Sequence, residues 1–188
     1  EDIALMRTIP GMVILNPSDD IEAKAAVKAA YEHEGPVYMR FGRLAVPIIN
    51  DRPDYKFEIG KGVTLREGKD VAIIATGLCV SESLAAAEKL AADGIDAKVI
   101  NIHTIKPLDE DLVVAAAKEC GKVVTVEEHS VIGGLGSAVC ETLSRKAPTP
   151  VKNIGVQDRF GESGPAVALL EKYGLNAEGI YASVKEFV

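Results

Sequence analysis

Two arginines, Arg40 and Arg43, close the segment Val37–Arg43, whose first residues favour a short strand. Arginine suits phosphate because its planar guanidinium group donates two parallel, charge-assisted hydrogen bonds. Ligands of open α/β sheets collect at the carboxyl ends of the strands, where both arginines are expected. An ordinary surface strand end with solvated arginines has the same pattern, so these residues alone leave both interpretations open.

A glycine-rich segment after His129 contains Gly133, Gly134 and Gly136 and joins a predicted strand to a predicted helix. The free N–H groups and the dipole of a helix N-terminus can bind an anion. The spacing G-G-x-G differs from the dinucleotide fingerprint G-x-G-x-x-G, and the glycines begin several residues after the strand. The alternative is that the glycines let the helix pack tightly on the sheet, with His129 and the two preceding acids at a subunit or domain contact.

Asp158 and Arg159 follow another predicted strand and precede Ser163 and Pro165. Serine often caps a helix and proline often occupies its first turn, so much of this segment has a folding explanation. The adjacent Asp158 and Arg159 are candidates for an ion pair at an interface.

Composition excludes several classes of function. The net charge of −7 argues against binding to nucleic acid or to an anionic membrane surface, and no apolar run is long enough to cross a bilayer. The three histidines and three cysteines show no metal-ligand spacing, so no protein-bound metal is expected. An odd number of cysteines without a disulfide pattern favours a reducing, cytoplasmic location.

The first 43 residues predict a truncated α/β half-domain with the order helix, strand, helix, strand. In the second helix, residues 21–33, Ala23, Val27, Ala30 and Tyr31 are spaced to form one apolar stripe. The strand of residues 12–15 is expected to pair with a neighbour or to fray, because two strands leave open sheet edges. The absence of an initial methionine also suggests a piece of a longer polypeptide.

Residues 44–55 contain two prolines and no sustained periodicity, which predicts a linker. Residues 56–188 then alternate apolar strand runs with helical patterns. The expected strands are residues 71–75, 97–100, 123–126 and 151–156, and the expected helices include residues 166–173 and 177–187. This alternation predicts a three-layer α/β/α domain with a mostly parallel sheet.

Three motifs together resemble the transketolase family of thiamine-diphosphate enzymes: Asp158–Gly164, Ile105–Asp109 and Thr125–His129. The last two motifs are also similar to deoxyxylulose-phosphate synthases and to the β subunits of 2-oxoacid dehydrogenases. Asp-Arg-Phe-Gly followed by Ser-Gly looks like transketolase specifically. The resemblance implies that residues 1–43 are the second half of the pyrimidine-binding domain and that residues 56–188 are the C-terminal domain.

The resemblance also implies the chemistry, in which a two-carbon ketol unit passes from a ketose phosphate to an aldose phosphate. Aligning Pro36 and Pro47 with the family pattern puts Arg43 where transketolases carry an arginine that binds the substrate phosphate, with Arg40 as the second choice. The family's catalytic glutamate and histidines precede this chain, so no catalytic residue is assigned within it.

Thiamine diphosphate and Mg²⁺ are expected in the complete enzyme but not tightly bound to this chain alone, which is expected to be inactive. The implied partners are sugar phosphates, a missing N-terminal region or a separate N-terminal subunit, and a second copy in a homodimer. Two alternatives stay open. One is a non-catalytic dimerisation or regulatory module, with an anion near Gly133–Gly136; the other is part of a 2-oxoacid dehydrogenase or deoxyxylulose-phosphate synthase.

Overall fold

The computed structural model describes all 188 residues and contains two sheets. The larger sheet has the strand order β3-β5-β4-β7-β8, in which only β3 is antiparallel to its neighbour. Its strands are β3 (Val63–Arg66), β4 (Val71–Ala75), β5 (Ala97–Asn101), β7 (Val123–Ser130) and β8 (Val151–Val156). The mostly parallel sheet predicted from the sequence is confirmed.

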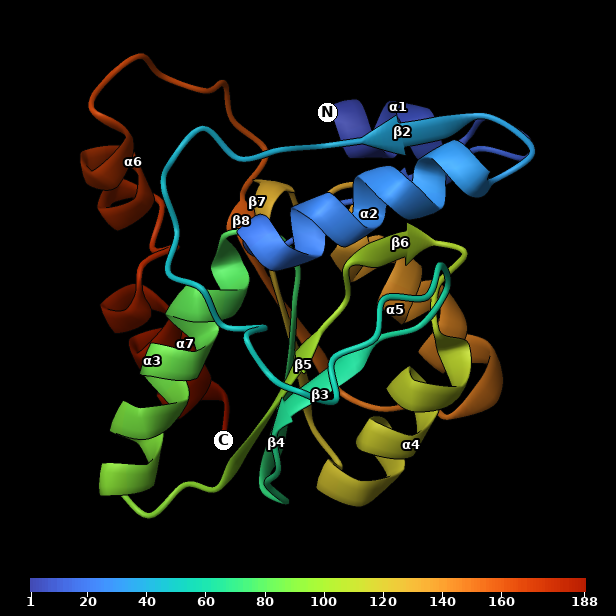
Figure 1. Cartoon of the computed structure of the whole chain (residues 1–188). Coiled ribbons are helices and arrows are strands. Elements are labelled where there is room, and N and C mark those ends of the chain that lie inside the picture. Colours follow the sequence, from blue (N-terminus) through green and yellow to red (C-terminus); the bar gives the residue numbers. More distant parts are fainter.

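Helices cover both faces of this sheet, as Figure 1 shows. One face is covered by α3 (Cys79–Ala92) and α7 (Ala177–Phe187), and the other by α4 (Glu110–Cys120) and α5 (Leu135–Lys146). The central strand β4 shows why a three-layer domain forms. Val71, Ile73 and Ala75 enter the core beneath α3, while Ala72 and Ile74 enter the opposite core, because successive strand side chains point to opposite faces. The short helix α6 (Ala166–Lys172) precedes α7.

The first block forms a second, smaller sheet with the order β2-β1-β6. Strand β1 (Val13–Leu15) pairs in parallel with β2 (Val37–Met39) and antiparallel with β6 (Thr104–Lys106). Helices α1 (Asp2–Arg7) and α2 (Asp20–Glu32) pack beside these strands. The strand expected to pair or fray is therefore a fully buried central strand, because β6, from the later part of the chain, covers its open edge.

The predicted apolar stripe of α2 is only partly correct, because Ala30 packs against the core formed by Val13, Leu15 and Ala26 but two other members do not. Tyr31 is 91% exposed and Val27 is 49% exposed, whereas Glu22 and Ala26 are buried. The helix is rotated about its axis because the Glu22 carboxylate takes part in a buried hydrogen-bond network. Its two oxygens accept hydrogen bonds from the backbone N–H and hydroxyl of Ser18, from the Tyr55 hydroxyl and from Asn101 Nδ2, at 2.7–3.1 Å.

This Glu22 network joins three parts of the chain. Ser18 and Glu22 belong to the first block, Tyr55 to the segment between β2 and β3, and Asn101 to the end of β5. Burial and the Glu22 carboxylate raise the pKa of Tyr55, so its hydroxyl stays protonated and donates. A buried carboxylate is tolerated only when such donors replace its lost water.

His103 lies in the two-residue connection between β5 and β6 and is fully buried. Its ring stacks on Phe57, with 4.2 Å between ring centroids, and Nδ1 lies 2.9 Å from Thr104 Oγ1. Burial lowers the pKa of His103 from its usual value of 6.5, so the imidazole is neutral at pH 7. The stack holds the segment that precedes β3 against the connection between β5 and β6.

We predict that Glu22→Gln lowers the free energy of unfolding by about 2–3 kcal/mol. The substitution replaces one carboxylate oxygen by an NH₂ group, which cannot accept a hydrogen bond from the buried donors that face it. Urea titration of the full chain measures this change. Asp20→Asn is the matched control, because it removes the same charge from an exposed carboxylate that pairs only with Lys24. Equal stability of the two variants would contradict the structural role of Glu22.

A second prediction concerns acid sensitivity. The pKa of His103 is lower when folded than when unfolded, so the unfolded chain binds the additional proton and stability falls as pH drops below about 6.5. Replacement by a non-titrating residue, His103→Gln, should make the unfolding free energy less dependent on pH between 7.5 and 5.5, by up to about 1.4 kcal/mol per pH unit. Urea titrations at the two pH values test this, and parallel pH dependences would contradict it.

Candidate functional site

The two candidate arginines both lie in the segment that follows β2, but their surroundings differ. The Arg40 guanidinium group is held within the chain, because Nε lies 3.0 Å from Asp2 Oδ2 and Nη1 lies 3.4 Å from Glu128 Oε2. Arg43 is exposed and makes no hydrogen bond or ion pair with any residue of the chain. Both arginines lie just beyond the carboxyl end of β2, but only Arg43 is free to bind a ligand.

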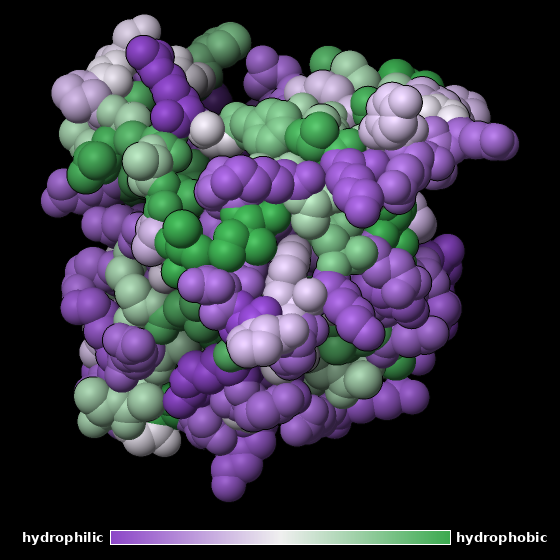
Figure 2. Space-filling model, in the orientation of Figure 1, coloured by the Kyte–Doolittle hydropathy of each residue, from purple (hydrophilic) through white to green (hydrophobic).

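A pocket of about 310 Å³ lies between this segment and the N-terminal turn of α2. Phe41, Gly42 and Leu44 form one wall, and Asp19 and Asp20 belong to the opposite side. In Figure 2 hydrophobic atoms reach the surface on the face that carries this segment, and Phe41 is 53% exposed. The neighbours of Arg43 on both sides thus line a cavity that is apolar on one side and acidic on the other.

Asp2 connects Arg40 to His129. Its carboxylate accepts hydrogen bonds from the Tyr38 hydroxyl at 2.8 Å and from Arg40, and its Oδ1 lies 3.8 Å from His129 Nε2. Burial raises the pKa of Asp2, but the Tyr38 hydrogen bond and the charge of Arg40 outweigh it and leave this pKa below the usual value. Tyr38, on β2, has a raised pKa because its hydroxyl donates to Asp2.

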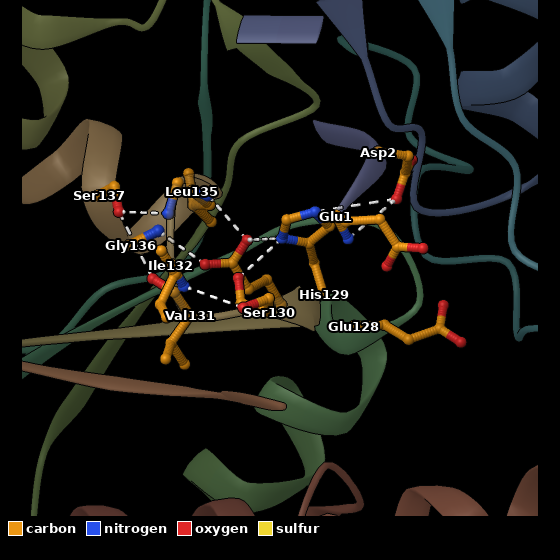
Figure 3. Close-up of polar contacts among 12 residues, drawn as sticks. Glu1, Asp2, Glu128, His129, Ser130, Val131, Ile132, Leu135, Gly136 and Ser137 are labelled. Atoms are coloured by element: carbon orange, nitrogen blue, oxygen red, sulfur yellow. Dashed lines mark hydrogen bonds and ion pairs between the residues drawn. The ribbon is translucent and has the colours of Figure 1, made fainter. Parts of the chain in front are cut away.

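Figure 3 shows His129 between Asp2 and the start of α5. The His129 side chain is 1% exposed, Nδ1 lies 2.7 Å from the Ser130 carbonyl oxygen, and Nε2 has no hydrogen-bond partner. Burial lowers the pKa of His129, so the ring is neutral at pH 7. Of the two roles considered for this residue, an anion site or a contact between parts, its position is that of a contact between the first block and the larger sheet.

The N-terminus of α5 is occupied by a carboxylate of the chain itself. Glu127 Oε2 accepts a hydrogen bond from the Leu135 N–H at 2.7 Å, and Oε1 accepts one from the Gly136 N–H at 2.8 Å. Glu127 is fully buried, and burial raises its pKa although these two N–H groups oppose the rise. An external anion would have to displace Glu127 from this position.

The glycines of this segment serve close packing. A side chain on Gly134 would collide with the Glu127 carboxylate, and one on Gly136 would lie 2.8–2.9 Å from atoms of Asn153 and Thr125 in the sheet. The Gly133 carbonyl accepts a hydrogen bond from Arg7 Nη1 at 2.7 Å, which ties α1 to this turn. Tight packing of the helix on the sheet, one of the two interpretations of these glycines, therefore has direct support.

Within the chain, Asp158 and Arg159 form no ion pair with each other, and their suggested pairing at an interface stays a prediction. The Arg159 guanidinium carbon lies 4.5 Å from the centroid of the ring of Tyr173, the residue that follows α6, so the arginine stacks on this ring. Asp158 is exposed, and the neighbouring Phe160 is 96% exposed. This segment forms an exposed loop between β8 and α6.

Sequence reasoning gave no functional role to Asp19, which fixes one end of the segment that carries Arg43, or to Glu22 and Asn101, which belong to the adjoining buried network. A signal is present in the sequence, because Asp19 directly precedes the helical pattern and Glu22 follows three residues later, as in a capping box. Asp19 Oδ1 does accept the Glu22 N–H at 2.8 Å. No group of three or more His, Cys, Asp or Glu side chains is placed to hold a metal ion. No helix is both long and apolar enough to span a membrane.

We predict that Gly134→Ala destabilises the chain by about 2 kcal/mol or more, because the new methyl group must push the Glu127 carboxylate off the α5 N–H groups. Thermal or urea unfolding measures this. Gly161→Ala is the matched control, since a methyl group there meets nothing within 4 Å and no left-handed backbone angle is required. A Gly134→Ala chain as stable as the Gly161→Ala chain would disprove the cap.

Two family patterns match the chain. The pattern described as "Transketolase, C-terminal domain" matches residues 60–180, and the pattern described as "Transketolase, pyrimidine binding domain" matches residues 1–48. The first pattern covers more than half of the chain and coincides with the larger sheet and its helices.

Curated relatives extend beyond this chain. A 6-deoxy-6-sulfo-D-fructose transketolase subunit of Clostridium sp. (strain MSTE9) is 47% identical over 99% of this chain and 58% of the relative. An apulose-4-phosphate transketolase subunit of Phocaeicola vulgatus is 43% identical over 100% of this chain and 60% of the relative. A 1-deoxy-D-xylulose-5-phosphate synthase of Geobacter sulfurreducens is 41% identical over 100% of this chain and 30% of the relative.

A solved structure described as a split gene transketolase, inactive β4 tetramer, superposes with a TM-score of 0.94 at 52% identity. The superposition covers 99% of this chain and 61% of the solved chain. This chain therefore spans about three fifths of the length of the subunits that it resembles. The family patterns, the curated relatives and this fold together show that the chain belongs to the transketolase family.

Proposed function

We propose that this chain contributes the binding site for the substrate phosphate to a transketolase-family enzyme. This enzyme moves a two-carbon ketol unit between sugar phosphates. Arg43 is the residue that binds the phosphate. The observation that carries this proposal is the contrast between Arg43, which is exposed and has no partner, and Arg40, whose guanidinium group is held by Asp2 and Glu128. Arg40 is accordingly assigned to the support of the segment, in place of the second-choice phosphate contact.

Arg43 would act by positioning the substrate. A guanidinium group on the terminal phosphate holds the sugar at its far end and orients the reacting carbon without touching it. The family's thiamine diphosphate supplies the electron sink that stabilises the two-carbon carbanion. We assign no residue of this chain to the diphosphate or to a metal ion, because its carboxylates and histidines form no cluster that fits one.

In this role Arg43 recognises the negative charge of the substrate and does not select the sugar that carries it. Two relatives are named for sugars that carry a sulfonate and a phosphate, respectively. A guanidinium group can pair with either anion, so Arg43 is compatible with both substrate classes. Ketol transfer from xylulose 5-phosphate to ribose 5-phosphate is the first reaction to assay, followed by formation of 1-deoxy-D-xylulose 5-phosphate.

Assembly is a second proposed role. The solved relative is described as an inactive tetramer of β chains. We propose on this basis that the present chain also self-associates and needs a further polypeptide or further sequence for activity. A non-catalytic module would assemble in the same way, but it would show no dependence of sugar binding on Arg43.

We predict that Arg43→Ala in the complete enzyme lowers kcat/KM for phosphorylated sugars about 100-fold, because a charge-assisted bidentate contact contributes about 3 kcal/mol. Unphosphorylated sugars should react as before. Arg43→Lys keeps the positive charge but cannot donate two parallel hydrogen bonds. Its kcat/KM should therefore lie between the values of the wild type and of Arg43→Ala. Lys118→Ala is the control, since Lys118 is an exposed cation on α4.

Steady-state ketol transfer with thiamine diphosphate and Mg²⁺ tests this prediction. An equal loss for phosphorylated and unphosphorylated sugars would contradict the phosphate contact. Activity unchanged by Arg43→Ala would contradict the proposed role of the residue altogether.

A further inference from the structure

The segment that carries Arg43 has no hydrogen bonds of its own. From Phe41 to Ile48 no backbone or side-chain group forms a hydrogen bond within the chain. Packing holds it in part, because Val46 lies against the core beneath α3. The direction in which Arg43 points is therefore set mainly at the two ends of the segment.

The first end is fixed by Arg40. Its backbone N–H donates to the Leu15 carbonyl oxygen at 2.8 Å and so continues the pairing of β1 with β2. Its side chain adds the contacts to Asp2 and Glu128.

The second end is fixed by one carboxylate. Asp19 Oδ2 accepts hydrogen bonds from the backbone N–H groups of Ile49 and Asn50, each at 2.8 Å. Asp19 Oδ1 accepts the Glu22 N–H and caps α2. The residue is 4% exposed. Burial raises the pKa of Asp19, but these hydrogen bonds outweigh burial and keep the pKa below its usual value.

Asp19 is also joined to the larger sheet through its neighbours. Asn50 Nδ2 and Asn101 Nδ2 both donate to Ser18 Oγ, at 3.1 and 3.2 Å. Ser18 in turn donates to Glu22, whose carboxylate also accepts from Asn101. The anchor of the Arg43 segment is thus continuous with the contact between the first block and β5.

We propose that Asp19 is a positioning residue for phosphate recognition: by holding Ile49 and Asn50 it fixes the segment 41–48 and aims Arg43 at the substrate phosphate. This inference rests on the proposed function of Arg43. It assigns to Asp19 no contact with substrate or cofactor. Displacement of a binding group by about 1 Å can lower the rate about 100-fold, so a positioning contact can matter as much as a direct one.

The two duties of Asp19 can be separated by substitution. Asp19→Ser keeps a good helix cap but is too short to reach Ile49 and Asn50. Asp19→Asn keeps the shape of the side chain and has only one acceptor oxygen for three N–H donors. Asp20→Ser is the matched control. It removes the same charge at the neighbouring position, where the Asp20 carboxylate contacts only Lys24. It controls for the change in electrostatic potential near Arg43.

The experiment measures kcat/KM of the complete enzyme for a phosphorylated and an unphosphorylated aldose acceptor. We expect Asp19→Ser and Asp19→Asn to lower the ratio of the two values at least about tenfold more than Asp20→Ser does. Combined with Arg43→Ala, Asp19→Ser should lower the ratio no further, because both changes remove the same contact. Amide hydrogen exchange at Ile49 and Asn50 should be faster in Asp19→Ser than in Asp20→Ser.

Three results would overturn the inference. If Arg43→Ala lowers the ratio but the Asp19 variants do not, Arg43 binds phosphate without help from Asp19. If Asp19→Ser and Arg43→Ala lower the ratio additively, Asp19 acts independently of Arg43. If Arg43→Ala leaves the ratio unchanged, the proposed function fails and the positioning role fails with it.

Discussion

The structure depends on the buried carboxylate of Glu22, which has no cationic partner. Its charge is stabilised by neutral donors from the first block, from the segment between β2 and β3, and from β5. Because a buried carboxylate without such donors costs several kcal/mol, these three parts have to meet in one arrangement. The same requirement turns α2 so that Glu22 faces inward, and it brings Asp19 to the end of the segment that carries Arg43.

A second polar cluster also joins the first block to the larger sheet. Asp2, Arg40 and His129 lie between the first block and the larger sheet, and Glu127 caps α5 close to His129. The segment from Arg40 to Asn50 therefore begins at one polar cluster and ends at the other. This arrangement gives a physical reason for an exposed arginine to have a defined direction on a segment without secondary structure.

The sequence predicted the larger domain well because its signals are local and redundant. Runs such as Val71–Ala75 are buried on both faces, and this burial is typical of parallel strands. The sequence did not predict β3, β6 or the orientation of α2. Strand β6 has three residues and forms only because β1 offers it an open edge, and the rotation of α2 depends on the distant residue Asn101. Family resemblance favoured Arg43 over Arg40, whereas the hydrogen bonds of Asp19 to Ile49 and Asn50 could be found only from the fold.

The most direct test of the account is the structure of the complete enzyme with a bound sugar phosphate. The account predicts that guanidinium nitrogens of Arg43 lie about 2.7–2.9 Å from phosphate oxygens, with Arg40 still paired to Asp2 and Glu128. A phosphate bound to Arg40, or bound by other residues while Arg43 remains in solvent, would contradict it.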